Sequence, residues 1–419
     1  MEGPTGAWCC LGSWSKVRVN PPDRLRTRAR ALVVTAAAAV CALSLPAAAA
    51  TAAAATAPSA LASSDWHQAA LPANYYVGNG DNGPPVSPVS CVHGTLFCLA
   101  VVSYLPPGLN GPIPQGVVVT DDRGAHWRGF ASLNSGPHVT AVSCPSRSVC
   151  WVAGVNTSTG APEIAESTNS GKTWSDKTPA TISSRNQQLN ALDCVSDAAC
   201  WVVGDDQTSG VVPLAAETTD GGSTWKTFAN LPTFPPYDPN GTYQLNAISC
   251  ISALDCIAGG GLNEADGLAQ VVSTTDGGQT WSLSADPALT SLQQIFSLSC
   301  LPSGGQATCT AAADNLAAAG PVVIRSTDGG ATWSGLNSFD TTGWMNSVSC
   351  PDAEHCWAAG AGTTVGLVGT SDGGRSWSVL DADTSNIEGL VSCASLTLCV
   401  ATTDNALWVT RDFGGIGGS

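Results

Sequence analysis

Charged side chains are scarce in this sequence, and positive charge is scarcest. Only 11% of the 419 residues are Asp, Glu, Lys or Arg, and 32 acidic residues face 16 basic ones, giving a formal net charge of −16. Proteins that bind nucleic acids or anionic membranes need a basic surface that displaces counterions. The composition therefore predicts no nucleic-acid partner, and no membrane partner once the leader segment described below is removed.

The common signatures of catalysis are also missing. No Ser/His/Asp arrangement, P-loop or dinucleotide fingerprint stands out in the sequence. The five histidines are scattered and offer no convincing general base: His67, His93, His126, His138 and His355. We therefore expect neither a cofactor nor a metal ion.

The first 65 residues differ from the rest of the chain. Arginines between Arg18 and Arg30 precede the apolar stretch ALVVTAAAAVCALSL, and PAAAA offers small residues for cleavage near Ala50. This pattern predicts a signal peptide over 1–50 and a disordered Ala/Thr/Pro-rich spacer over 51–65. The alternative is an uncleaved membrane anchor, because 31–50 is long enough to span a bilayer. We expect a secreted or cell-envelope protein, and the Ala-rich leader favours a bacterial source.

Two ladders of residues repeat along the remaining chain. One is an eight-residue motif, written STDGGATW at Ser326–Trp333, whose six near-copies end at Trp127, Trp174, Trp225, Trp281, Trp333 and Trp377. The other consists of cysteine pairs: Cys91 and Cys98, Cys144 and Cys150, Cys194 and Cys200, Cys250 and Cys256, Cys300 and Cys309, Cys350 and Cys356, and Cys393 and Cys399. Seven pairs indicate seven repeats of about 50 residues, numbered here in chain order.

One repeat, residues 245–285, shows what each unit contains. Short apolar runs separated by turn residues predict four strands, joined by hairpins at the cysteine pair and at the DGGQ turn. Seven such units predict an all-β fold over 66–419, a seven-bladed β-propeller of four-stranded antiparallel blades. The last repeat begins the motif as VTRDFGG but lacks its Trp. Conversely, Trp66 is not preceded by the first half of the motif. We therefore expect the N- and C-terminal segments to close the ring within one blade.

The cysteine spacing predicts disulfides. Each pair brackets a short hairpin, which places two cysteines opposite each other on neighbouring strands at a distance that a disulfide accepts. Regular pairs in a secreted protein are normally oxidised. Metal binding is the competing interpretation, and it is disfavoured because no histidine has ligand spacing beside these pairs.

The eight-residue motif resembles the Asp box, or BNR repeat, of sialidases, xyloglucanases, sortilin-type receptors and photosystem II assembly-factor propellers. In size and plan the chain is most similar to the assembly factors. The resemblance implies that the Asp box is a folding device, in which Asp and Gly form a tight turn and Trp packs between blades. The expected structural positions are Asp122, Asn169, Asp220, Asp276, Asp328 and Asp372.

The placement of the arginines argues against sialidase activity. In the sialidases that the motif resembles, this activity requires three arginines around a substrate carboxylate. Asp-box turns and cysteine hairpins are expected on one face of the propeller and the ligand-binding loops on the other, the binding face. Of seven arginines after the leader, six lie in or beside the Asp boxes and cysteine hairpins, and only Arg185 falls in a loop predicted for the binding face. We therefore expect a monomeric, non-catalytic binding or scaffold module for a carbohydrate or protein partner. An extracellular glycoside hydrolase using loop carboxylates is the alternative, and a purely structural envelope protein is a third possibility.

Loop residues on the predicted binding face are the candidate ligand contacts. The acidic candidates are Asp205, Asp206, Glu264, Asp266 and Asp314, which could instead be solvated loop charges. The aromatic candidates are Tyr75, Tyr76, Tyr237, Tyr243 and Trp344, which could instead pack against a neighbouring blade. Trp151, Trp201 and Trp357 follow a second cysteine in three repeats, and this recurrence predicts core positions.

Overall fold

The structure is a computed structural model. It describes residues 66–78, 87–109, 113–133, 137–208, 211–228, 231–232, 243–262, 268–315, 320–339, 343–362, 366–381, 389–403 and 405–411, all within one unit, Pro58–Ser419. The predicted signal peptide, 1–50, and spacer, 51–65, lie outside these ranges. Within them, no helix has the length and hydropathy needed to cross a bilayer.

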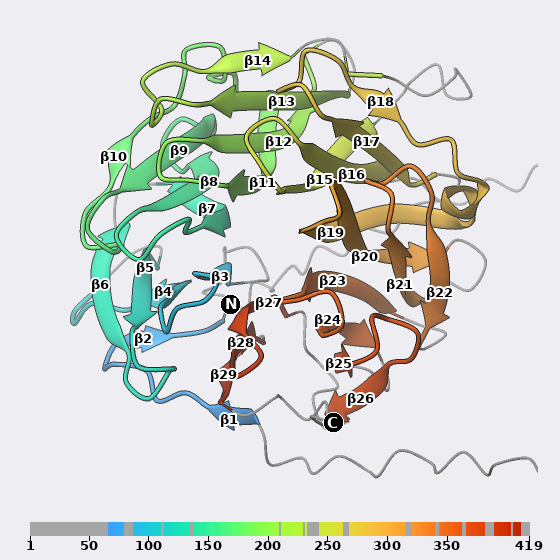
Figure 1. Cartoon of the computed structure of the whole chain (residues 1–419). Helices are drawn as coiled ribbons and strands as arrows, with labels where there is room; N and C mark the ends of the chain where they lie inside the picture. The colour runs from blue at the N-terminus through green and yellow to red at the C-terminus, as the bar shows by residue number, and fades with distance from the viewer. Residues whose placement is uncertain are drawn as a thin grey trace, which may run out of the picture. The chain divides into compact units, whose positions relative to one another are not determined.

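Repeats 1 to 3 each form one antiparallel sheet (Figure 1). Repeat 1 contains β2 (Tyr75–Tyr76), β3 (Val89–Cys91), β4 (Cys98–Tyr104), β5 (Gln115–Thr120) and β6 (Arg128–Leu133). Repeat 2 contains β7 (Pro137–Ser143), β8 (Cys150–Asn156), β9 (Pro162–Ser167) and β10 (Ser175–Asp176). Repeat 3 contains β11 (Gln187–Cys194), β12 (Cys200–Asp206), β13 (Val212–Thr218) and β14 (Lys226–Phe228).

Repeats 4 and 5 share a sheet, and repeats 6 and 7 form one each. Repeat 4 contains β15 (Tyr243–Cys250), β16 (Cys256–Leu262), β17 (Gln270–Thr274) and β18 (Ser282–Leu283). Repeat 5 contains the 3-10 helix η1 (Pro287–Ser291), β19 (Leu292–Ser303), β20 (Gln306–Asn315), β21 (Pro321–Ser326) and β22 (Ser334–Ser338). Repeat 6 contains β23 (Gly343–Ser349), β24 (Cys356–Gly362), β25 (Leu367–Thr370) and β26 (Ser378–Asp381). Repeat 7 contains β27 (Val391–Ser395), β28 (Leu398–Thr402), β29 (Leu407–Thr410) and β1 (Trp66–Gln68).

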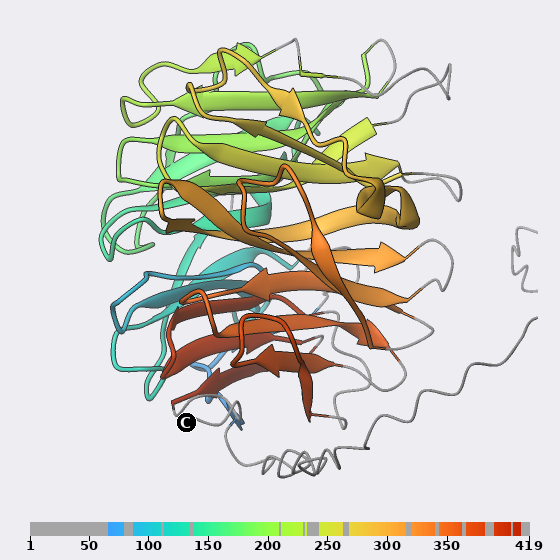
Figure 2. The ribbon, with the colours of Figure 1, turned by 45° about the vertical axis from the view of Figure 1, so that its right-hand side comes forward.

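The sheets follow one another around a ring, which confirms the all-β propeller, but the prediction of seven separate four-stranded blades is wrong (Figures 1 and 2). Five sheets have the size of one blade, with four or five strands each, and the sixth has eight strands. Repeats 4 and 5 merge because Gly261 of β16 pairs with Gln294 of β19. The missing side chain permits this approach, since a Cβ on Gly261 would lie 2.5 Å from the Gln293 backbone oxygen.

The two ends of the described chain meet in one sheet. Strand β1 pairs with β29, with Trp66 opposite Thr410, so the first strand completes the sheet of the last repeat. The sequence predicted this closure from the two incomplete motifs. Joining the ends in one sheet leaves no gap in the ring at which an unpaired strand edge would be exposed.

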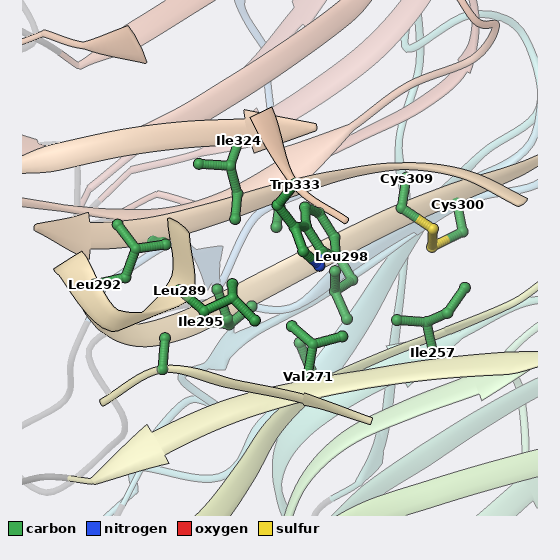
Figure 3. Packing of buried hydrophobic residues seen from close by; sticks show 14 of the residues in the cluster. Ile257, Val271, Leu289, Leu292, Ile295, Leu298, Cys300, Cys309, Ile324 and Trp333 are labelled. Atoms are coloured by element: carbon green, nitrogen blue, oxygen red, sulfur yellow. A yellow bond between two sulfur atoms is a disulfide. The ribbon is translucent and has the colours of Figure 1, made fainter. Parts of the chain in front are cut away.

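Alternate residues of each strand pack against opposite neighbours, as the period of a β-strand requires. Trp201 and Val203 contact repeat 4, whereas Val202 contacts repeat 2. Figure 3 shows such a junction between repeats 4 and 5, where Trp333 packs among Ile257, Leu298 and their neighbours. Trp151, Trp201 and Trp357 are fully buried, which confirms the predicted core positions.

All seven predicted cysteine pairs form disulfides, with Cα–Cα distances of 4.0 to 4.1 Å. The bonds join Cys91 to Cys98, Cys144 to Cys150, Cys194 to Cys200, Cys250 to Cys256, Cys300 to Cys309, Cys350 to Cys356 and Cys393 to Cys399. This confirms the pairing that the spacing predicted. Each bond closes a loop of fewer than ten residues, so the chain-entropy model gives each only about 2 kcal/mol.

The disulfides and the Asp-box turns lie at the same end of the strands. In every repeat the second cysteine is opposite the Ser or Thr at the end of the third strand. Cys200 is opposite Thr218, for example, and Cys309 is opposite Ser326. In the last repeat Cys399 is opposite Thr410. Disulfides and Asp-box turns therefore share one face of the ring, the disulfide face. The opposite strand ends form the face on which ligand binding was predicted, named the binding face below.

A closed series of hydrogen bonds, which the sequence analysis missed, links each repeat to the next. The residue before the first cysteine of one repeat accepts the backbone N–H of the first cysteine of the following repeat. The pairs are Ser90 with Cys144, Ser143 with Cys194, Asp193 with Cys250, Ser249 with Cys300, Ser299 with Cys350, Ser349 with Cys393 and Ser392 with Cys91. Asp193 is the one acceptor of this series that is not a serine. Burial raises its pKa to about 6, although hydrogen bonds from neighbouring backbone N–H groups and from Ser143 act in the opposite direction.

Candidate binding face

The aspartates of the Asp-box turns are occupied within their own turns. In the fifth repeat, Asp328 Oδ1 accepts Ser326 Oγ–H (2.8 Å) and Thr332 N–H (2.9 Å), and Oδ2 accepts the Thr332 hydroxyl. The same pattern recurs at Asp220, Asp276 and Asp372. Both oxygens therefore already have donors, which favours a structural role.

Asn169 shows that the turn needs acceptors and not an acid. Its Oδ1 accepts Thr173 N–H at 2.9 Å, while its Nδ2 donates to Thr173 Oγ1 at 2.7 Å. At Asp122 the backbone N–H of His126 is the main cause that lowers the pKa of the carboxyl to about 2, with further hydrogen bonds from His126 and Thr120. A carboxylate held this firmly ionised is a poor proton donor.

Two substitutions at Asp328 should separate the turn from any chemistry. We expect Asp328→Asn to change the free energy of unfolding by less than about 0.5 kcal/mol, because Asn169 fills the same place. Asp328→Ala removes three accepted hydrogen bonds and should cost about 1–2 kcal/mol. Urea denaturation of both variants measures this, and equal losses would contradict the hydrogen-bond account of the turn.

Asp205 and Asp206 lie at the binding-face end of β12, about 17 Å along the strand from Cys200. Asp205 is fully buried, and its carboxylate accepts Gln207 Nε2–H at 2.9 Å; burial raises its pKa. Burial also opposes ionisation of Asp206, but hydrogen bonds from Thr208 and Gln187 lower its pKa overall. Adjacent strand residues point to opposite faces, so these two carboxyls are not placed as a paired catalytic acid and base.

Asp314 meets the backbone of β23, next to Trp344, at the junction of repeats 5 and 6. Trp344, in β23, is 42% exposed, and the backbone N–H of the next residue, Met345, donates to the Asp314 carboxyl. Asp314 Oδ1 is buried and has no hydrogen-bond partner among the described residues. Burial raises the pKa of Asp314 to about 7, which the Met345 hydrogen bond only partly offsets.

Asp314 and Asp205 occupy the same place in their repeats, five residues after the second cysteine. At the 3/4 junction, Asn190 donates to Leu245 O (3.0 Å) and lies 3.4 Å from Asp205 Oδ1. Leu245 holds the same place in repeat 4 as Met345 does in repeat 6, five residues before the first cysteine. The sequence singled out each acid. It did not show that Asp314 bonds the backbone next to Trp344 and keeps one oxygen without a described partner, while Asp205 accepts hydrogen bonds from the side-chain amides of Gln207 and Asn190.

The other aromatic candidates are less available for a ligand. Tyr243 is partly buried at the start of β15, and its backbone N–H donates to Val211 O at 3.3 Å. Tyr75 packs against Tyr104 of its own sheet, with ring centroids 4.8 Å apart. Three candidates, Tyr237, Glu264 and Asp266, lie outside the described residues.

The inner strands line a central cavity of about 160 Å³. Several carry a bulge residue whose side chain bonds the next repeat: Thr140 to Leu189 O (2.9 Å), Asn190 to Leu245 O and Asn246 to Ile295 O (3.4 Å). These polar side chains therefore form hydrogen bonds between neighbouring repeats. In the described ranges, no group of three or more His, Cys, Asp or Glu side chains is arranged to hold a metal ion.

Asp314 should make stability depend on pH. Its folded pKa of about 7 exceeds the ordinary value near 3.8, so its stabilising contribution is complete below pH 3.8 and is lost as the pH rises through 7. Between pH 5 and pH 8 this group should lower the free energy of unfolding by on the order of 2 kcal/mol. We expect Asp314→Asn to lack this component when denaturation is measured at both pH values; parallel pH profiles for the two proteins would contradict it.

Comparison with known proteins adds the fold's relatives. No family model and no curated protein sequence matches the chain. Among solved structures, YCF48 from Cyanidioschyzon merolae is 16% identical, with 83% of this chain and 98% of that chain covered and a TM-score of 0.53. This chain has the same propeller fold.

Two further structures share this propeller fold. YCF48 bound to D1 peptide is 15% identical, covering 81% and 99% of the two chains at a TM-score of 0.50. A polysaccharide lyase of family PL25, an ulvan lyase, is 12% identical, covering 83% and 96% at a TM-score of 0.51. These likenesses confirm the predicted β-propeller fold, and identities this low do not carry function across.

Proposed function

We propose that the protein is a secreted, non-catalytic β-propeller that binds a carbohydrate on its binding face, at Trp344 and Asp314. The observations that carry this proposal are the exposed indole of Trp344 and, bonded to the backbone of the next residue, the Asp314 carboxyl, one oxygen of which has no partner among the described residues. A sugar ring presents C–H groups that pack on an aromatic face and hydroxyls that need acceptors. Trp344 supplies the first contact and the partly exposed Asp314 carboxyl the second.

Three features support binding without catalysis. The Asp-box carboxylates are occupied within their turns, and Asp205 and Asp206 point to opposite faces of their strand. Arginine side chains on the disulfide face donate to backbone carbonyls, as Arg325 does to Ala353 O and Arg411 to Gly124 O. A hydrolase would need a second carboxyl placed opposite Asp314.

A glycoside hydrolase is the second candidate, and the raised pKa of Asp314 favours it. A carboxyl that keeps its proton near neutral pH is suited to act as a general acid. Product release from a bound polysaccharide distinguishes this candidate from the binding module.

The chain organisation completes the proposal: a signal peptide over 1–50, a spacer over 51–65 and the propeller over 66–419, in an extracellular protein of a bacterium. Seven disulfides support export, because such bonds persist in oxidising compartments. Edman sequencing of the exported protein should find its first residue near position 51, and an intact N-terminus would favour the anchor.

Trp344→Ala is expected to weaken carbohydrate binding at least tenfold, because stacking and apolar contact on an indole are worth more than about 1.4 kcal/mol. Leu254→Ala provides the matched control, since Leu254 is 56% exposed on the disulfide face. Calorimetric titration with the glycans that stabilise the wild-type protein measures both. Equal affinities for wild type and Trp344→Ala would place the ligand elsewhere.

A further inference from the structure

A groove of about 410 Å³ lies on the disulfide face between repeats 5 and 6, away from Trp344. Its lining includes Arg325 and Arg375 together with Glu354 and the glycines of the repeat 6 turn. We propose that this groove binds a small oxyanion, a sulfate, phosphate or carboxylate group. The proposal is independent of the proposed carbohydrate site.

Arg325 brings a positive charge into the groove and bonds backbone oxygens there. It precedes the repeat 5 turn at the end of β21 and donates to the oxygens of Gly373 and Ala353, the latter at 2.7 Å. Backbone carbonyls accept hydrogen bonds but carry no net charge. Burial, followed by repulsion from Arg375, lowers the pKa of Arg325, and attraction to Asp372 offsets this only in part. The two guanidinium groups are therefore close enough to interact.

Arg375 supplies the second guanidinium, from the turn of repeat 6. It is exposed, and its Nη1 donates to the Asp372 backbone oxygen at 2.8 Å. The Asp372 carboxylate is occupied by Thr370 and Ser376 within the turn. No ion pair involves either arginine within the described ranges.

A third donor lies beneath the groove. The Trp377 indole N–H is buried and has no partner in the part of the chain that the structure describes. A Cβ on Gly374, which lines the groove, would lie 3.6 Å from Trp377 Nε1 and 4.0 Å from Arg325 Cδ. The groove is therefore lined by two guanidinium groups, and the buried Trp377 N–H lies behind Gly374.

The equivalent groove between repeats 2 and 3 shows how this arrangement differs from a purely structural one. There, Glu166 holds the place of Arg325 and pairs with Lys177 at 3.2 Å, and Lys177 also donates to Gly221 O at 3.0 Å. The indole of Trp225, equivalent to Trp377, donates to Lys177 O at 2.9 Å. An ion pair matches the charges in that groove. In the 5/6 groove neither arginine forms an ion pair with Glu354 or Asp372, which also line it, so the guanidinium donors are in excess of the acceptors that they bond.

An oxyanion fits this excess. A guanidinium presents paired N–H groups that match two oxygens of a sulfate, phosphate or carboxylate, and two such groups can hold one anion from different sides. The anion could be free in solution or a substituent on a sugar. Galactose 6-sulfate, galactose and inorganic sulfate therefore serve together as probes.

Titration of the full propeller with sodium sulfate, at ionic strength held constant with sodium chloride, tests the proposal. We expect saturable binding that Arg375→Gln weakens at least tenfold, since a charge-assisted hydrogen bond contributes about 1.5 kcal/mol or more. Arg185→Gln is the control, because Arg185 is an exposed arginine that also donates to a backbone oxygen, Thr159 O at 3.0 Å. Arg375→Lys should bind with intermediate affinity, because it keeps the charge but loses the planar fork.

Sulfate that binds no better than chloride, or Arg375→Gln that binds as wild type does, would overturn the proposal. Binding of galactose 6-sulfate but not of galactose at this groove would indicate a sugar-borne anion, and equal binding of inorganic sulfate a free one. Trp344→Ala should leave sulfate binding unchanged. Failure of this site is thus separable from failure of the carbohydrate site.

Discussion

Replacing Gly204 with alanine is expected to lower the free energy of unfolding by more than about 3 kcal/mol, through overpacking against backbone. A Cβ on Gly204 would lie 1.9 Å from the Gln188 oxygen and 2.8 Å from its carbonyl carbon. Both atoms belong to the backbone of β11, which is paired with β12 on either side of the bulge at Asn190 and therefore resists displacement. Backbone displacement would also disturb the junction that Asn190 makes with repeat 4.

The fold itself provides the control for this prediction. The same place, four residues after the second cysteine, holds Gly154, Gly260 and Gly360, each with a Cβ position 1.9 to 2.2 Å from a backbone oxygen of the first strand. Repeat 5 has Ala313 there, opposite a strand with an additional register shift. Ala313→Gly should therefore cost about 1 kcal/mol, and urea denaturation that finds similar losses for both variants would contradict the steric explanation.

Trp201→Ala is expected to cost about 3–5 kcal/mol, as large-to-small changes in a core do. The indole is fully buried, stacks on Phe228 at 5.1 Å between centroids and meets Trp281 edge-on at 5.7 Å. Its Nε1–H donates to Ala253 O of repeat 4 at 3.2 Å. The substitution therefore opens a cavity in the junction between repeats 3 and 4.

The exposed Trp344 gives the comparison, because the same substitution there removes little buried contact and should cost less than about 1 kcal/mol. Differential scanning calorimetry of both variants measures the difference. A similar loss of melting temperature for the two would mean that the recurring tryptophans do not hold the ring together.

The sequence predicted the features that recur. Cysteine spacing identified all seven disulfides, and the place of Trp151, Trp201 and Trp357 after a cysteine identified core positions. The blade count was wrong because hydrogen bonding between Gly261 and Gln294 depends on how closely two repeats approach. Repeat spacing contains no information on that distance.

The sequence identified residues of the candidate site but not their arrangement. Asp314 and Trp344 are 30 residues apart, and the hydrogen bond between Asp314 and the residue after Trp344 follows from packing of a second strand against the first strand of the next repeat. The junction hydrogen bonds had a signal that could have been found: serine precedes the first cysteine in six of the seven repeats, and Asp193 takes its place in repeat 3. A periodic small polar residue at a strand end indicates a repeated contact.

Non-catalytic carbohydrate binding is tested most directly by incubating the purified propeller, from Trp66 onward with a short leader, with a panel of glycans and polysaccharides that includes sialosides. Thermal shift and release of reducing ends are recorded on the same samples. The account predicts that at least one glycan raises the melting temperature and that no product forms. Product release that is abolished in Asp314→Asn would contradict it and identify a glycoside hydrolase.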